Sequence, residues 1–128
     1  MENGIHNHCI FCHSEVGGVL FSSELVYSRF DLYLVSPGHV LVIPKRHISS
    51  IFDATSEEVH ALWEQVIRVK EFLDGEYAPD GYNIGINDGT AAGQTIMHLH
   101  IHVIPRYVGD MEDPKGGVRG VIPEKQKY

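Results

Sequence analysis

Short runs of β-branched and aromatic residues, separated by turn residues, dominate the first 44 positions of the chain. Such runs are typical of β-strands, and they predict four of them, at residues 19–21, 25–27, 32–35 and 40–43. The connections between these runs are too short for a parallel crossover. The pattern therefore predicts antiparallel hairpins.

A helical period replaces the strand pattern after residue 55. Thr55 and Glu58 have the spacing of a capping box, in which each side chain bonds the backbone N–H of the other residue. One apolar stripe follows at helical spacing, formed by Val59, Leu62, Trp63, Val66, Val69 and Leu73. Gly75 suits a left-handed C-terminal cap, which predicts a helix over residues 56–74.

The second half of the chain returns to strand patterns. Residues 82–87 predict a strand, residues 88–93 a loop of small residues, and residues 94–104 a strand that Pro105 ends. The following segment is rich in glycine, proline and charge and has no clear period. The length of 128 residues and the lack of an internal repeat predict a single domain.

Composition narrows the classes of function. The formal net charge of −7 argues against general nucleic-acid binding, although it leaves room for one small anionic substrate. No apolar run reaches the length of about 18 residues that a membrane span needs. Residues 1–6 lack the pattern of a secretory signal, so we expect a cytoplasmic protein. In that compartment the two cysteines favour metal binding or free thiols over a disulfide.

The histidine run is the most informative chemical pattern. His98, His100 and His102 alternate with aliphatic residues. On a strand, this period of two places all three imidazoles on one face, roughly 7 Å apart along it. The spacing alone leaves a metal site and a catalytic site equally open, because imidazole is also the commonest metal ligand.

The loop before the histidine run favours catalysis. Glycines such as Gly89 and Gly93 let backbone N–H groups approach a phosphate closely. The loop is not a P-loop, because no Lys-Ser/Thr pair follows it. Gln94 and Thr95 add side-chain donors beside the first histidine. Phosphate donors next to an imidazole indicate phosphoryl chemistry rather than a closed metal site.

Two segments resemble those of the histidine triad (HIT) family of nucleotide hydrolases and transferases. They are Ser36-Pro37-Gly38-His39-x-Leu41-Val42-Ile43-Pro44-Lys45-Arg46-His47 and Asn87-x-Gly89-x-x-x-Gly93-Gln94-Thr95-x-x-His98-x-His100-x-His102-Val103. The resemblance implies an α+β fold, with a five-stranded antiparallel sheet, one long helix and a homodimer that extends the sheet. It covers a core of about residues 9–109, leaving a Gly/Pro-rich tail at 110–128.

The resemblance also implies a mechanism. The middle histidine, His100, attacks the α-phosphorus and forms a nucleotidyl-histidine, which water then hydrolyses. The backbone carbonyl of His98 accepts from the His100 ring, and His102 donates to phosphate oxygens. Gln94 and Thr95 hold the phosphate and the leaving group. A neutral imidazole suits this role, because at pH 7 it is a nucleophile without a strong base.

The same resemblance assigns residues to the substrate. Asp31 lies six positions before Pro37, where the family places its ribose-binding residue; the alternative is an acid in a surface turn. Phe11 and Leu32 are candidates for a base slot, and the alternative for each is ordinary core packing. Asn87 and Gly93 join Gln94 and Thr95 on the phosphate side.

A zinc site is the predicted cofactor. The pair Cys9-Ile10-Phe11-Cys12 is weak evidence alone, because a structural zinc needs four ligands. Family members with this pair bind zinc through it together with two histidines, which here are His47 and His98. The alternative is two reduced cysteines packed as small apolar residues. His13 is a candidate replacement ligand, and His6, His8 and His60 receive no role.

Three functions remain open at this point. The pairing of Ala92-Gly93-Gln94-Thr95 with Ile104-Pro105-Arg106 resembles the dinucleoside polyphosphate hydrolases, with diadenosine tetraphosphate as an example substrate. His47 departs from the animal members of that branch and resembles the nucleoside phosphoramidases, which implies an adenosine 5′-monophosphoramidase. A nucleotide- or zinc-binding regulatory protein with little turnover is the third alternative.

Overall fold

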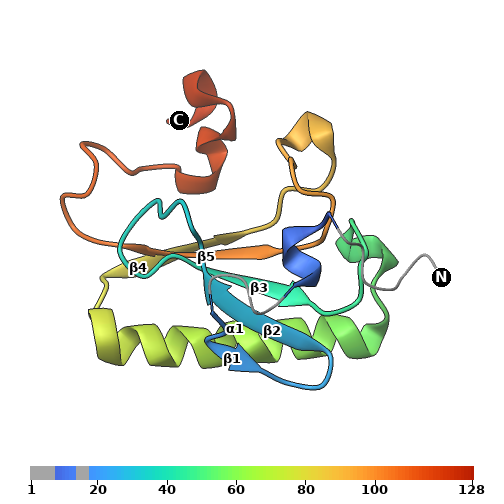
Figure 1. Cartoon of the computed structure of the whole chain (residues 1–128). Coiled ribbons are helices and arrows are strands. Elements are labelled where there is room, and N and C mark those ends of the chain that lie inside the picture. The colour runs from blue at the N-terminus through green and yellow to red at the C-terminus, as the bar shows by residue number, and fades with distance from the viewer. Residues whose placement is uncertain (1–7, 14–17) are drawn as a thin grey trace.

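The sheet has five strands, and every neighbouring pair is antiparallel (Figure 1). The computed structural model describes residues 8–13 and 18–128, so the N-terminal segment tested for a secretory signal lies outside it. The spatial order is β1-β2-β3-β5-β4. The strands are β1 (Phe21–Ser22), β2 (Val26–Phe30), β3 (Val40–Pro44), β4 (Gly81–Gly85) and β5 (Ile101–Arg106). The expected five-stranded antiparallel sheet is confirmed.

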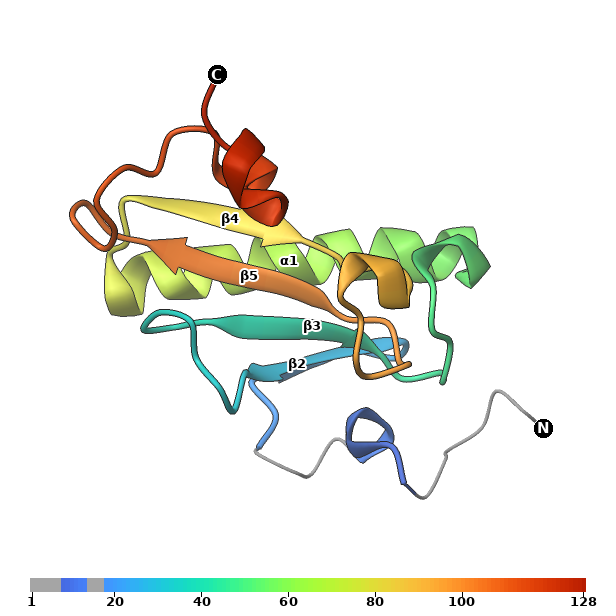
Figure 2. The ribbon, with the colours of Figure 1, turned by 90° about the horizontal axis from the view of Figure 1, so that it is seen from above.

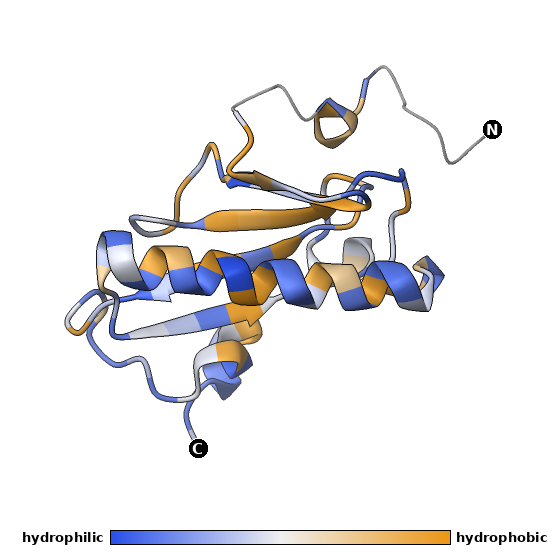
Figure 3. Cartoon of the chain, turned by 90° about the horizontal axis from the view of Figure 1, so that it is seen from below, coloured by the Kyte–Doolittle hydropathy of each residue, from blue (hydrophilic) through white to orange (hydrophobic). Residues whose placement is uncertain are grey.

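One long helix, α1 (Ser56–Tyr77), covers one face of this sheet. Its buried side chains Leu62, Val66, Val69 and Leu73 pack against the β3 and β5 residues Val40, Val42, Ile101 and Val103. Figure 3 views the molecule from the helix side: β3 is coloured hydrophobic along most of its length, whereas β4 is mostly neutral or hydrophilic. Burial of this aliphatic layer is the main source of stability. No helix among the described residues is long and apolar enough to span a membrane.

The ends of α1 show how far the local pattern was correct. The capping box is present: Thr55 Oγ1 accepts from Glu58 N at 3.1 Å, and Glu58 Oε1 accepts from Thr55 N at 2.9 Å. The predicted cap at Gly75 is wrong, because the helix continues to Tyr77 and the left-handed cap is Ala78, with φ 48°. Pro79 follows Ala78, and a residue before proline avoids the helical conformation. Trp63 was placed on the buried stripe but is 42% exposed.

Two of the predicted strands need correction. Residues 32–35 form an exposed loop between β2 and β3, because the Asp31 carboxylate accepts from Tyr33 N and turns the chain away from the sheet. The predicted strand 94–104 begins only at Ile101 and runs through Pro105 to Arg106. Pro105 is tolerated there because the β3–β5 ladder ends at the pair Val40–Val103, so no backbone N–H is needed at position 105 on that side. The Pro105 carbonyl, which faces the same side, accepts from the Ser36 hydroxyl instead.

The sheet face opposite α1 carries a second, smaller cluster at one side. Phe11, from the 3₁₀ turn η1 (Ile10–Cys12), packs with Tyr27, Leu41 and Ile43. At the other side, the tail forms two further 3₁₀ turns, η4 (Gly117–Val121) and η5 (Pro123–Lys125). Figure 2 shows η1 and the tail on opposite flanks of the sheet. The histidine run lies between these flanks.

Candidate active site

The three predicted histidines come together beside β5, although only His102 lies within that strand. Leu99 N donates to Ile48 O at 2.6 Å, which shows that the segment before β5 is held by the loop after β3 rather than by strand pairing. His98 is fully buried, His100 is 9% exposed, and His102 is half-buried. The ring centroids of His100 and His102 are 5.1 Å apart, close enough for both rings to contact one phosphate group.

The His100 ring has a defined protonation pattern. Its Nδ1–H donates to the His98 carbonyl at 2.8 Å, because a carbonyl oxygen can only accept. The lone pair of the neutral ring is therefore on Nε2. Burial lowers the pKa of His100, and the His98 carbonyl only partly opposes this. His100 is thus a neutral imidazole at pH 7 with an available nucleophilic nitrogen.

His102 has the complementary pattern, and His39 imposes it. Val35 N donates to His39 Nδ1 at 3.1 Å, so the His39 proton is on Nε2. That Nε2–H donates to His102 Nδ1 at 3.0 Å, which leaves His102 with a proton on its own Nε2. Burial, followed by repulsion from His100 and His39, lowers the pKa of His102 to about 4. One ring therefore presents a lone pair and its neighbour a donor.

His39 is the residue that sequence reasoning missed. It is 1% exposed, and burial lowers its pKa against the opposing Asp31 carboxylate, whose Oδ2 lies 3.5 Å from its Nε2. It stands within the Ser36–His47 motif, but no role was assigned to it. One signal could have found it. His39 lies two residues before Leu41, which pairs with His102, and residues two apart on an extended chain share a face.

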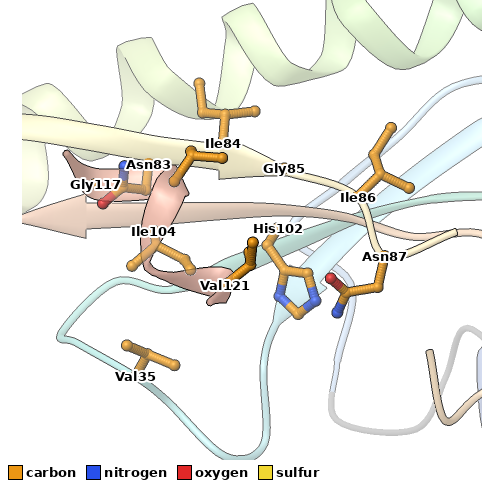
Figure 4. A pocket seen from close by; sticks show the side chains of 11 residues that line it. Val35, Asn83, Ile84, Gly85, Ile86, Asn87, His102, Ile104, Gly117 and Val121 are labelled. Atoms are coloured by element: carbon orange, nitrogen blue, oxygen red, sulfur yellow. The ribbon is translucent and has the colours of Figure 1, made fainter. Parts of the chain in front are cut away.

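The small-residue loop has the backbone that its glycines allow. Gly89 and Gly93 have φ values of 95° and 97° and flank a short 3₁₀ turn. Gln94 is buried and braces this loop: its Oε1 accepts from Gly89 N, and its Nε2 donates to the carbonyls of Ser49 and Ile96. Thr95 is exposed, as is Asn87, whose side chain lies beside His102 in Figure 4.

The residues expected at the nucleoside occupy different positions. Phe11 packs edge-on against His100, with ring centroids 4.9 Å apart, and is 3% exposed as part of the second cluster. Asp31 faces His39 at the same side of the sheet. Leu32 lies in the exposed loop and is 55% exposed. The structure thus brings Phe11 and Asp31 to the histidines, while Leu32 stays at the surface.

A Cys/His cluster lies directly behind the histidine pair. The sulfur of Cys12 is 3.1 Å from His47 Nδ1 and 3.6 Å from His98 Nδ1, and the sulfur of Cys9 is 3.4 Å from His98 Nδ1. These four ligand atoms lie within 4.8 Å of one another. Adjacent sulfur and nitrogen ligands of a tetrahedral zinc are about 3.6 Å apart, as the usual bond lengths require.

The second nitrogen of His98 supports a metal-ligand role. His98 Nε2–H donates to Pro44 O at 2.7 Å, which leaves the Nδ1 lone pair directed at the sulfurs. Burial raises the pKa of the Cys9 thiol, and a bound cation would reverse this. His13, the alternative ligand, is not among the four converging groups. The residues present therefore fit a tetrahedral metal ion.

The sheet, its single helix and the paired imidazoles define an α+β protein with a histidine-centred site. The chain belongs to the histidine triad family, since the HIT domain model matches residues 16–109. It is 41% identical over 95 residues to a bis(5′-adenosyl)-triphosphatase of Dictyostelium discoideum, covering 74% of this chain and 64% of the relative. It is also 41% identical over 100 residues to an AP-4-A phosphorylase of Mycobacterium tuberculosis, covering 75% and 50%. The chain thus spans about half to two thirds of these relatives.

Solved structures show the same fold. A HIT family protein from Bacillus subtilis superposes with a TM-score of 0.74 at 35% identity, covering 81% of this chain and 76% of that one. A Zn-bound histidine triad family protein from Mycobacterium smegmatis gives a TM-score of 0.73 at 35% identity, covering 83% and 80%. The second likeness is relevant to the Cys/His cluster.

Proposed function

We propose that this protein is a nucleotide hydrolase or transferase that cleaves dinucleoside polyphosphates, such as diadenosine tetraphosphate, at the α-phosphate. The observation that carries this proposal is the complementary protonation of His100 and His102, with a lone pair on one Nε2 and a proton on the other. The names of the relatives, a bis(5′-adenosyl)-triphosphatase and an AP-4-A phosphorylase, support this substrate class.

The proposed reaction has two displacements at phosphorus. His100 Nε2 forms a bond to the α-phosphorus while the bond to the bridging oxygen breaks, and the leaving polyphosphate takes the electron pair. His102 Nε2–H donates to the developing charge on oxygen. Water then attacks the nucleotidyl-histidine, releases the mononucleotide and restores the neutral ring. Gln94 keeps the phosphate loop in shape, and Thr95 and Asn87 are its exposed polar groups.

Asp31 is proposed to bind the transferred nucleoside by accepting from its ribose hydroxyls. The Phe11 ring is buried in the second cluster, where it packs edge-on against His100 and supports that ring. The metal proposed for Cys9, Cys12, His47 and His98 is a structural zinc, which would hold the N-terminal turn against the histidine segment. His47, the residue that pointed to a phosphoramidase, lies in this cluster, so a metal-ligand role accounts for its presence.

The proposed assembly is a cytoplasmic homodimer. Within the part of the chain that the structure describes, strand β4 pairs only with β5, so its outer edge is a sheet edge that a second copy could extend. The thiols of the Cys/His cluster suit a reducing compartment. Light scattering tests the dimer, which should have about twice the chain mass of 14.3 kDa.

Trapping the covalent intermediate tests the reaction. Single turnovers with substrate labelled on the α-phosphate are quenched, and acid-labile label is expected on the native protein. His100→Asn should lose the label and several orders of magnitude in rate while still binding nucleotide. His102→Asn should lose less, because it removes a donor. His60→Asn, at a side chain 79% exposed on α1, is the matched control. Label that persists in His100→Asn would refute the assignment.

A further inference from the structure

The tail at residues 110–128 lies beyond the HIT domain match, yet its residues Gly117, Val118 and Val121 line the same cavity as His102. Gln126 Nε2 donates to Lys115 O at 3.1 Å, Arg119 Nε donates to Lys125 O at 3.2 Å, and Lys127 pairs with Asp113 at 3.1 Å. A Cβ on Gly116 would collide with the carbonyl oxygen of Gln126, so the tail folds back at a position that admits only glycine. The tail is therefore a self-braced unit.

This unit forms one wall of a cavity of about 370 Å³ next to His102 (Figure 4). The volume is within the range of about 300–1,000 Å³ typical of small-molecule sites. His102 and Asn87 make one end of the cavity polar. The rest is mainly apolar, and its walls come from four segments: the β2–β3 loop, β4 with the two residues after it, β5 and the tail. The aliphatic residues among them are Val35, Ile84, Ile86, Ile104, Val118 and Val121.

Three of these apolar side chains are unusually exposed. Val35 is 71% exposed, Val118 65% and Val121 77%. Aliphatic groups that surround a cavity and remain open to water are typical of a binding surface, because a ligand would remove them from water. The ligand must combine an apolar body with a polar end that reaches His102.

The direction of the reaction identifies which part of the substrate reaches this cavity. In an in-line displacement the leaving group departs opposite to the nucleophile. His102 lines the cavity, whereas His100, Phe11 and Asp31 do not. The transferred nucleoside occupies the Phe11 and Asp31 side under the proposed function. The leaving group therefore faces His102 and the cavity beyond it.

We propose that the C-terminal tail completes a leaving-group subsite that takes the second nucleoside of a dinucleoside polyphosphate. This inference rests on the proposed function and deepens it. The base of the departing nucleotide lies among Val35, Ile104, Val118 and Val121, while its phosphates lie toward His102 and Asn87. A substrate whose leaving group lacks a nucleoside leaves these side chains exposed to water, and it reacts with lower specificity.

The test compares two substrates that differ only in that nucleoside. Diadenosine tetraphosphate loses ATP on attack by His100, and adenosine 5′-tetraphosphate loses tripolyphosphate. We expect kcat/KM to be about ten-fold higher for the dinucleotide, the size of effect that a few apolar contacts give. The double variant Val118→Ser/Val121→Ser should remove most of this preference and leave the second substrate within about two-fold. Val121→Trp should block the dinucleotide in the same way.

Val108→Ser is the matched control, because Val108 is 88% exposed, precedes the tail and lies outside the cavity. It should keep the native preference. Equal kcat/KM for both substrates in the native protein would overturn the subsite. Equal losses of kcat/KM for both substrates in the tail variants would overturn it too. In either case, turnover itself would still support the proposed function. Turnover of neither substrate would refute the proposed function and this inference with it.

Discussion

The Nε2 atom of His39 lies 3.0 Å from Nδ1 of His102, and this contact determines which nitrogen of His102 carries the proton. His39→Phe removes that donor and frees the His102 tautomer. We expect kcat to fall about ten-fold with little change in KM, as for other residues that orient a functional histidine. His39→Gln, whose amide can donate from a similar position, should recover part of the loss. Equal rates in both variants would contradict a positioning role.

The buried histidines predict a pH dependence of stability. The pKa of His102 falls from 6.5 to about 4 on folding, and the pKa of His39 is also lowered. Between these values the unfolded chain binds more protons, so the free energy of unfolding should decrease as the pH falls from about 6.5 toward 4. The contribution of these two histidines should be constant above pH 7. Urea denaturation at several pH values measures this, and His102→Gln should reduce the slope.

Metal content tests the Cys/His cluster. Protein purified without a polyhistidine tag should contain about one zinc per chain by elemental analysis, and a chelator should lower its melting temperature. Cys12→Ser should lose the metal, because it removes a thiolate close to both histidines. His13→Asn should keep it, since His13 is outside the cluster. A metal-free native protein with unchanged melting would exclude the site.

Glu58 should matter more than its capping partner. Thr55→Ala removes one cap bond and should cost about 1 kcal/mol. Glu58→Ala also breaks two bonds to Arg46, at 2.9 and 2.8 Å, and should cost about 2–3 kcal/mol because Glu58 is buried. Arg46 precedes the proposed ligand His47, so zinc affinity should fall as well. Similar costs for both variants in urea titrations would contradict this ranking.

Arg29 offers a stabilising substitution. Its side chain is 1% exposed, its Nε and Nη1 atoms have no hydrogen-bond partner among residues 8–13 and 18–128, and its guanidinium lies 5.6 Å from the centroid of the Phe11 ring. Replacing a buried, incompletely paired charge by an apolar residue is often stabilising. Arg29→Met should therefore raise the melting temperature. Arg68→Met, at an exposed residue of α1, is the comparison: its guanidinium lies 4.1 Å from the centroid of the Phe21 ring, so losing this contact should lower the melting temperature slightly. A lower melting temperature for Arg29→Met would show that the guanidinium is stabilising.

Local sequence patterns correctly predicted those parts of the fold that depend on interactions between residues close together in the sequence. The capping box and aliphatic stripe of α1 are of this kind, and both were predicted. Residues 32–35 have high β-propensity but lie in a loop, because the Asp31 carboxylate accepts from Tyr33 N in a turn and none of the described strands pairs with them. His98 and His100 are positioned by Ile48 and Pro44, about fifty residues away, so their placement outside a strand could not be predicted from a period of two.

The candidate site divides in the same way. The order of the histidines and the cysteine pair was visible in the sequence through the family resemblance. The contact between His39 and His102 spans 63 residues and has no periodic signature. The tail is similar, because its fold depends on contacts such as Gln126 to Lys115 that no hydrophobic period indicates. Irregular segments held by single polar contacts were therefore the part of the site that could not be predicted from the sequence.

His98 serves two partners with two different parts of its structure. Its ring faces the sulfurs and Pro44, while its main-chain carbonyl accepts from His100. Every amino acid has that carbonyl, so the tautomer of the nucleophile does not depend on which side chain occupies position 98. An engineer could exchange the His98 ring for another potential metal ligand, or repack the Cys/His cluster with apolar side chains, while the acceptor for His100 stays in the backbone. Under the proposed function, the rings of His100 and His102 perform the chemistry, and the side chain at position 98 is open to redesign.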